Sequence, residues 1–213
     1  TDFVYFGQGK ETYRWPLQIK SNYRKDDFSG LIRFCQTLSL PSAQLQQQIE
    51  NVMDVDEVAR CMALGSLCGI ADSYFNDTVH NLRVFVRPDQ KVVALPWDMD
   101  FVFYHPATSP VLPAGRKLHQ VFQLPCYQRL YYGHLQDLVN TTFNTGYMTY
   151  WMAHYSSLLP GQNFTTQLPY IQARGDYALT QLPSQVPFAI TTNSGSNFSV
   201  DTTGVTLAGT GWI

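Results

Sequence analysis

The segment from Asp54 to Gly69 constrains the fold of this chain most, because it carries the signals of a buried helix at both ends. Asp54 is a good N-cap residue, and Glu57 stands where a capping box would place it. Apolar residues then recur with helical spacing until Gly69 ends the pattern. Acidic residues at a helix start complement the helix dipole, so we interpret them as caps rather than as a metal site.

After Gly69 the period of the apolar residues changes from that of a helix to that of a strand. Residues 81–87 alternate with period two, residues 88–90 have the composition of a turn, and residues 91–95 form a β-branched run. These features predict a β-hairpin that follows the helix.

Further apolar stripes with helical spacing predict an α+β protein that is mainly α. We expect these stripes to face the core, and we interpret His134 and His154, which lie on two of them, as packing residues. The predicted additional helices cover residues 27–38, 41–53, 125–138, 147–158 and 167–182.

The composition excludes two classes of partner. The chain has 213 residues and a formal net charge of −2, so it lacks the basic excess that nucleic-acid binding requires. No uninterrupted apolar run approaches the ~20 residues of a membrane-spanning helix, so we expect no membrane insertion.

The four cysteines form no C-x-x-C pair, which excludes a zinc ribbon or a thioredoxin-type motif. Cys61 and Cys68 would share a helix face, but a rise of about 1.5 Å per residue separates them by about 10 Å. That separation is too long for a disulfide. We therefore interpret the cysteines as buried free thiols.

The residues with chemical potential are concentrated between Asp72 and Asp100. If the hairpin turn centres on Asp89, strand pairing places Asn81 roughly opposite Asp98, at the open end that the Asp72 loop enters. Two carboxylates and an amide are hard oxygen ligands, which suit Mg²⁺ or Mn²⁺ holding a phosphate. A nearby carboxylate could also accept a proton from an attacking hydroxyl. The alternative is that the two aspartates cap local turns and that the asparagine satisfies backbone groups.

The order of these residues resembles the CotH family, spore-coat-H-like proteins with an atypical protein-kinase fold. The resemblance rests on Asp72-Ser-Tyr-x-x-Asp-x-x-His80-Asn81, then a hairpin, then Leu95-Pro-Trp-Asp98-x-Asp100. It is supported by the helix start Val52-Met-Asp-Val-Asp-Glu and by Leu124-Pro-Cys-Tyr, and it covers roughly residues 13–183.

The resemblance implies a role for each matching residue. Asp72 would be the catalytic aspartate that orients or deprotonates the acceptor hydroxyl. Asp98 and Asn81 would bind the metal and the nucleotide, with Asp100 as a further metal ligand and His80 as a further nucleotide-binding residue. The implied reaction is transfer of the γ-phosphoryl group of ATP, with Mg²⁺ or Mn²⁺, to a Ser or Thr of a protein substrate.

The resemblance also implies a domain division and a location. Residues 1–183 would be the C-terminal lobe of a CotH-like kinase, with helices and a hairpin that carries the site. Residues 184–213 resemble the start of a small β module that follows CotH domains in large bacterial proteins. Those proteins are secreted or on the cell surface, so we expect an extracellular or cell-surface location in a bacterium.

Two departures from the kinase pattern stand out. Protein kinases place the asparagine five residues after the catalytic aspartate, whereas nine residues separate Asn81 from Asp72. Kinases also grip the nucleotide with a glycine-rich loop and a strand lysine, and neither Lys10 nor Lys20 lies in such a strand pattern. We therefore expect a fragment that lacks the nucleotide-gripping lobe and is inactive alone.

Three other functions remain open at this point. The chain could be a non-catalytic structural or interaction module of a large surface or secreted protein. Asp98-Met-Asp100 could be the Asp-x-Asp of a glycosyltransferase, although no βαβ alternation supports the sheet that this requires. Exposed aromatic residues could bind carbohydrate, although helical spacing predicts burial for most of the candidates, which are Trp97, Trp151, Tyr131 and Tyr132.

Overall fold

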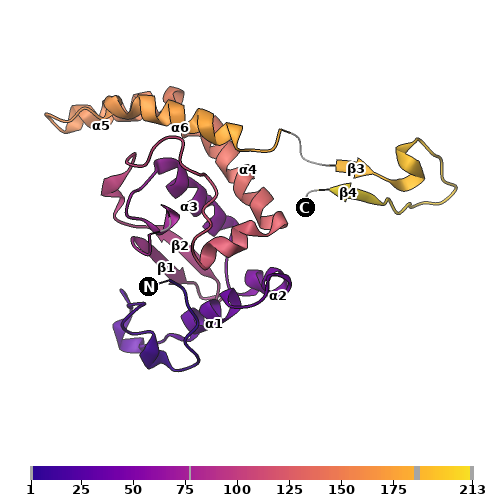
Figure 1. Ribbon diagram of the computed structural model, residues 1–213, viewed down its shortest axis with the longest axis horizontal. Helices are drawn as coiled ribbons and strands as arrows, with labels where there is room; N and C mark the ends of the chain where they lie inside the picture. The colour runs from indigo at the N-terminus through magenta and orange to yellow at the C-terminus, as the bar shows by residue number, and fades with distance from the viewer. Residues whose placement is uncertain (1, 77, 185–187, 212–213) are drawn as a thin grey trace.

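The computed structural model describes residues 2–76, 78–184 and 188–211, and it is mainly helical with two small antiparallel sheets (Figure 1). The predicted fold class is confirmed, and so are the predicted helices, except that the helix predicted over residues 41–53 is an α-helix only as far as Gln48, and Val52 and Met53 pair with Val92 instead. Thr1, Asp77, Pro187 and the final Trp212-Ile213, to which parts of the predictions refer, lie outside the described residues. The helices are α1 Ser29–Leu38, α2 Ser42–Gln48, α3 Val55–Cys68, α4 Pro125–Thr141, α5 Thr145–Leu158 and α6 Leu168–Thr180. The strands are β1 Leu82–Val86, β2 Val92–Pro96, β3 Phe188–Ile190 and β4 Gly209–Gly211.

Helix α3 is the central element of the core, and its ends form as predicted. The Asp54 carboxylate accepts a hydrogen bond from the Glu57 N–H at 3.2 Å, and Gly69 ends the helix in the left-handed conformation (φ 56°). The other half of the capping box is absent. The Glu57 carboxylate instead accepts the N–H of Ala94 in β2 at 3.0 Å, so it joins the helix start to the hairpin.

Helix α4 lies against α3 and confirms its predicted core stripe (Figure 1). Tyr131 and Leu135 are fully buried, and His134 is buried with its Nε2 2.9 Å from a carboxylate oxygen of Asp56. The interpretation of His134 as a packing residue is confirmed.

Helix α5 contradicts its prediction, because its aromatic stripe faces solvent. Tyr150 is 66% exposed, Tyr155 51% and Trp151 37%, and His154 is exposed as well. Met152 is the buried residue of this helix. The helix has no charged side chain, so its apolar period does not distinguish the inner face from the outer one.

Helix α6 buries the predicted Ile171 and Ala178, and between them it buries Arg174 completely. The Arg174 guanidinium donates to the carbonyl oxygens of Ser66 at 2.9 Å and Ala107 at 3.0 Å, and also to that of Ser109. This side chain therefore fastens the loop that follows the hairpin to α3 and α6.

All four cysteines are free, and burial raises the pKa of the Cys35, Cys61 and Cys68 thiols to about 12. Cys126 is only partly buried, which differs from its prediction. Among the residues that the structure describes, no helix combines the length and the apolarity needed to span a bilayer.

Candidate functional site

The β1–β2 hairpin positions the predicted site residues. Its strands pair from Leu82 opposite Pro96 to Val86 opposite Val92. The turn at 88–90 ends with Gln90 in the left-handed conformation (φ 69°), which is the geometry of a three-residue hairpin loop. Continuing the register places Asn81 opposite Trp97, one residue from the partner expected from the sequence.

Asp72, Asn81 and His80 are joined by hydrogen bonds. The Asn81 side-chain amide donates to Asp72 Oδ2 at 2.8 Å, and Asn81 Oδ1 lies 2.9 Å from His80 Nδ1. Because the amide nitrogen faces Asp72, the amide oxygen accepts a hydrogen bond from His80, which requires the imidazole tautomer with its hydrogen on Nδ1. Asn81 is left-handed (φ 49°), a conformation that asparagine tolerates.

The long spacing between Asp72 and Asn81 is accommodated by a closed loop. Residues Tyr74–Asn76 form a 3₁₀ turn, and the Tyr74 N–H donates to the His80 carbonyl at 2.8 Å. The nine-residue gap therefore does not prevent direct contact between the two side chains.

One oxygen of Asp72 has no partner. Oδ1 is buried and accepts no hydrogen bond from any described residue, whereas Oδ2 holds Asn81. Buried polar atoms are nearly always paired, so an orphaned carboxylate oxygen marks a place for a hydroxyl donor or a cation.

Asp98 and Asp100 lie on the chain segment beside Asp72. Asp98 follows β2 in the left-handed conformation (φ 56°), and both carboxylates are exposed. The Ala71 N–H donates to the Phe101 carbonyl at 3.2 Å, so the two segments run side by side. Neither carboxylate accepts a hydrogen bond from a described residue.

The structure therefore joins three of the five predicted site residues directly and places the other two on a neighbouring segment. Within residues 2–76, 78–184 and 188–211, no group of three His, Cys, Asp or Glu side chains is close enough to hold a metal ion. A metal here would depend on one or two carboxylates, an amide oxygen and ligands from outside the chain, which is an ordinary arrangement for Mg²⁺.

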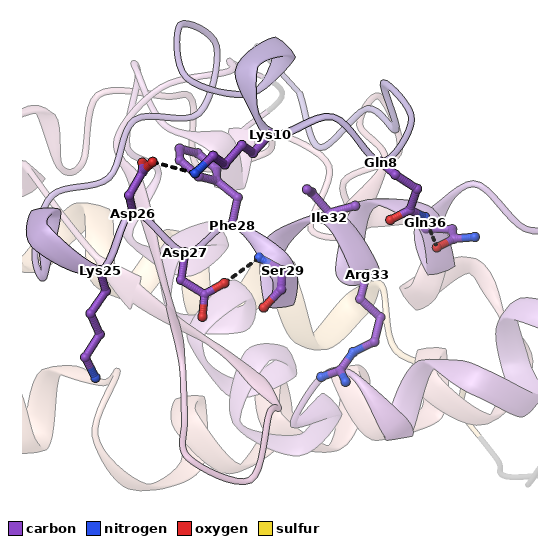
Figure 2. A pocket seen from close by; sticks show the side chains of 10 residues that line it. All are labelled: Gln8, Lys10, Lys25, Asp26, Asp27, Phe28, Ser29, Ile32, Arg33 and Gln36. Carbon is purple, nitrogen blue, oxygen red and sulfur yellow. Dashed lines mark hydrogen bonds and ion pairs between the residues drawn. The ribbon is translucent and has the colours of Figure 1, made fainter.

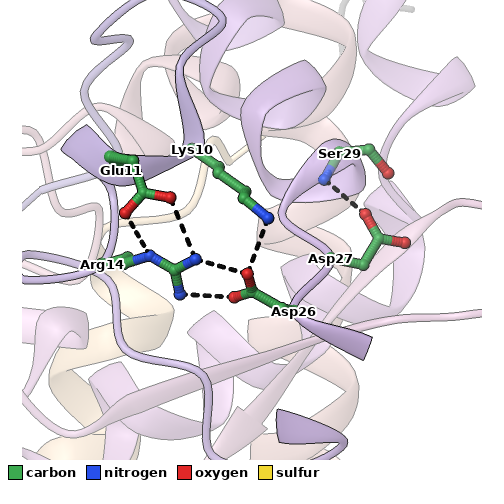
Figure 3. Close-up of polar contacts among 6 residues, drawn as sticks. All are labelled: Lys10, Glu11, Arg14, Asp26, Asp27 and Ser29. Carbon is green, nitrogen blue, oxygen red and sulfur yellow. Dashed lines mark hydrogen bonds and ion pairs between the residues drawn. The ribbon is translucent and has the colours of Figure 1, made fainter. Parts of the chain in front are cut away.

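The N-terminal lysines do not take the role of a kinase strand lysine. Lys10 lies in a 3₁₀ turn and pairs with Asp26 at 2.7 Å, in a network that also includes Arg14 and Glu11 (Figure 3). Arg14 and Lys10 hold the pKa of Asp26 well below its usual range. The described residues before α3 form no strand.

A cleft of ≈ 940 Å³ leads to the site. One wall is the segment 15–31, the other is β1, and the lining includes His80 and Asn81. A second hollow lies at the start of α1 (Figure 2), where Asp26 is already paired with Lys10 and Asp27 accepts the Ser29 N–H. We assign the function to the cleft because Asn81, whose side chain donates to Asp72 Oδ2, lines it.

The sequence patterns did not predict the tertiary contacts of two residues, Glu57 and Arg174. Glu57 was interpreted only as a cap, although it binds the edge of β2. Arg174 interrupts the apolar stripe of α6 one turn after Ile171, and a charge inside such a stripe was a readable sign of a buried clamp.

The aromatic candidates for carbohydrate binding divide. Tyr131 is buried as expected, but Trp97 is 47% exposed, and the Arg83 guanidinium stacks on its ring at 3.2 Å. The sheets described are both two-stranded and antiparallel, so Asp98-Met-Asp100 does not lie on the α/β sheet of a glycosyltransferase.

Comparison with protein families agrees with the geometry. The model of the family described as CotH kinase protein matches residues 7–174, which is most of the chain. A comparison with curated proteins finds no match. The chain belongs to the CotH kinase protein family.

Proposed function

We propose that this chain carries the acceptor-activating and metal-binding part of a protein Ser/Thr phosphotransferase that uses ATP. The observation that supports this most is the buried Oδ1 of Asp72, which has no partner among the described residues while Oδ2 is held by Asn81. A carboxylate fixed at one oxygen and vacant at the other is arranged to accept a hydrogen bond from a substrate hydroxyl.

The proposed metal ligands are Asp98 and Asn81, with Asp100 as a further candidate. Their oxygen donors suit Mg²⁺ or Mn²⁺. Because both carboxylates are exposed, they are accessible to a metal ion that also binds a phosphate. A divalent ion bound there would neutralise charge on the phosphate oxygens. His80 acts indirectly, because its Nδ1–H fixes the orientation of the Asn81 amide.

In the proposed reaction, a Ser or Thr hydroxyl of the substrate donates its hydrogen bond to Asp72 Oδ1. The hydroxyl oxygen forms a bond to the γ-phosphorus of ATP, and the bond from that phosphorus to the bridging oxygen breaks. ADP leaves with that oxygen, and the hydroxyl proton passes to the Asp72 carboxylate. Asn81 keeps the carboxylate aimed throughout.

Nucleotide binding is expected to be weak in this chain alone. The described residues before α3 form no strand, so a glycine-rich hairpin with a strand lysine is not among them. Titration calorimetry with ATP and Mg²⁺ or Mn²⁺ should therefore give a Kd well above the micromolar range. A micromolar Kd would show that ATP binding does not require a lobe with a glycine-rich hairpin and a strand lysine.

The test of phosphotransfer uses the longest natural protein that contains this chain, assayed for autophosphorylation. Asp98→Ala should lower labelling about a hundredfold or more, as loss of a group that stabilises transferring charge does. Asp89→Ala is the matched control, because Asp89 lies at the other end of the same hairpin and pairs with Arg87. Equal labelling of the Asp98→Ala variant and the wild type would remove the proposed metal role.

A second candidate is a non-catalytic interaction module of a bacterial surface or secreted protein. The exposed aromatic face of α5, including Tyr150 and Tyr155, and the exposed Phe188 of β3 favour it. The extracellular or cell-surface location is part of both proposals. A wild-type protein that shows no metal-dependent labelling, yet binds a surface component through α5, would support this second function.

A further inference from the structure

The outer edge of β1 is open. The Arg87 N–H donates to the Lys91 carbonyl, so the backbone groups of Arg87 point toward the partner strand. In an antiparallel pair, residues whose backbone groups point toward the partner strand alternate with residues whose backbone groups point away from it. The backbone groups of Leu82, Val84 and Val86 therefore point away from β2. No described residue makes a hydrogen bond to them there.

The outer edge of β2 is closed. The Val92 N–H donates to the Val52 carbonyl at 2.8 Å, and the Val92 carbonyl accepts the Asp54 N–H at 2.9 Å. The Ala94 N–H is bound by Glu57, and Pro96 has no N–H to offer. Of the two edges of this hairpin, the β1 edge is therefore the one that the described residues leave free to accept another strand.

The open edge lines the cleft along its whole length, and the cleft continues to His80 and Asn81. The opposite wall is formed by residues 15–31, which the ion pairs of Asp26 with Lys10 and Arg14 tie back to the preceding turn (Figure 3). Five residues of strand span about 17 Å, so the edge presents a repeated pattern of donors and acceptors beside the site.

The charge of the cleft is positive. Lys20, Lys25 and Arg83 line it, and none of them forms an ion pair with a described residue. Figure 2 shows the Lys25 amine extended away from the paired Asp26. Among the described residues that line the cleft, Asp27 is the one carboxylate. The fourth cation of the lining, Arg87, forms ion pairs with Asp54 and Asp89, which lie outside the cleft.

We propose that the β1 edge binds an extended, acidic segment of the acceptor protein as a third strand and so delivers a Ser or Thr beside Asp72. The inference rests on the proposed function and adds the class of substrate to it. A row of unpaired backbone groups is complementary to an extended peptide backbone, whereas a nucleotide offers no such repeat. The three cations, whose charge no described carboxylate neutralises through an ion pair, favour acidic side chains on that peptide.

Binding is tested on the 213-residue chain without ATP or metal, so that it is independent of phosphotransfer. The probe is a fluorescein-labelled peptide that alternates Glu and Val around one Ser. The control peptide has the same sequence with alternate backbone amides N-methylated, which removes the hydrogen bonds of one edge. The first should bind and slow hydrogen exchange at the amides of Leu82, Val84 and Val86, and the second should do neither.

Charge variants give a second readout. Lys25→Glu should weaken binding about threefold to tenfold, as expected for reversal of an exposed charge facing an anion. Arg24→Glu is the matched control, because Arg24 is exposed on the same turn but does not line the cleft. Its effect should stay within about twofold.

Three outcomes would overturn the inference. Equal binding of the N-methylated peptide would exclude strand addition, and equal effects of the two charge variants would exclude recognition by the cleft. Displacement of the peptide by ATP without metal would assign the cleft to a nucleotide. Loss of labelling in the Asp98→Ala protein with unchanged peptide binding would support both proposals, whereas peptide binding without any phosphotransfer would sink only the proposed function.

Discussion

The two edges of the β1–β2 hairpin have the same backbone and opposite surroundings. On the β2 side, the residues before α3 form hydrogen bonds with both the N–H and the carbonyl of Val92, and a side chain of α3 accepts the N–H of Ala94. On the β1 side, Leu82, Val84 and Val86 face a cleft with cations that form no ion pair with a described residue. The difference teaches that the helix start fixes the hairpin by one edge and leaves the other edge for a partner. The predictions below test that asymmetry.

The largest effect is expected from placing proline on each edge in turn. Ala94→Pro removes the N–H that Glu57 binds, so it should lower the free energy of unfolding by about 3 kcal/mol or more. Val84→Pro removes an N–H that points outward, so it should cost about 2 kcal/mol less than Ala94→Pro. Urea unfolding followed by circular dichroism measures both. Equal costs would mean that the two edges are not different.

The next effect concerns the carboxylate that closes the β2 edge. Glu57→Ala leaves the Ala94 N–H without its acceptor and should cost about 1–3 kcal/mol. Glu57→Gln keeps an acceptor oxygen and serves as the matched control, which should retain most of the wild-type stability.

Glu57 also predicts the sign of a pH effect. Burial raises the pKa of Glu57 in the folded protein. The stability that its protonated form contributes is fully present below the unfolded pKa of about 4.3 and is lost as pH rises through the higher folded value. Glu57→Gln should remove this loss. A steeper fall of stability with rising pH in the Gln variant would contradict the assignment.

The smallest effect concerns the wall opposite the open edge. Arg14, and then Lys10, lower the pKa of Asp26, so the stability from these pairs is present above the unfolded pKa of about 3.9 and is lost as pH falls below it. Because the network is exposed, Asp26→Asn should change the melting temperature little at pH 7 and should flatten its decline in acid. An unchanged acid decline would show that the network does not hold the wall.

The sequence predicted those parts of the fold that local signals determine. Asp54 and Gly69 bound α3 because capping and the left-handed C-terminus are properties of a few adjacent residues. The hairpin register was predicted within one residue, because the turn at Asp89 fixes it. That register placed Asn81 at the end of the hairpin that the Asp72 loop enters, but it did not predict the hydrogen bond between the two side chains.

The parts that failed depend on tertiary contacts. The aromatic stripe of α5 has the right period for a core face, but nothing in the chain identifies which neighbour would cover it, and Trp151 remains partly exposed. The bond from Glu57 to Ala94 joins residues 37 apart in sequence. The roles of Asp98 and Asp100 stay predictions, because their carboxylates form no hydrogen bond or ion pair with a described residue.

Arg174 has a consequence for the order in which this protein can be made. Its partners Ser66, Ala107 and Ser109 lie far upstream, with a sequence separation of 108 residues from Ser66. Their carbonyl oxygens have no cation until Arg174 leaves the ribosome, since translation proceeds from the N-terminus. These contacts of Arg174 can therefore form only when nearly the whole family region has been synthesised. A nascent chain halted before α6 would carry the site residues without the clamp that fastens the loop that follows the hairpin.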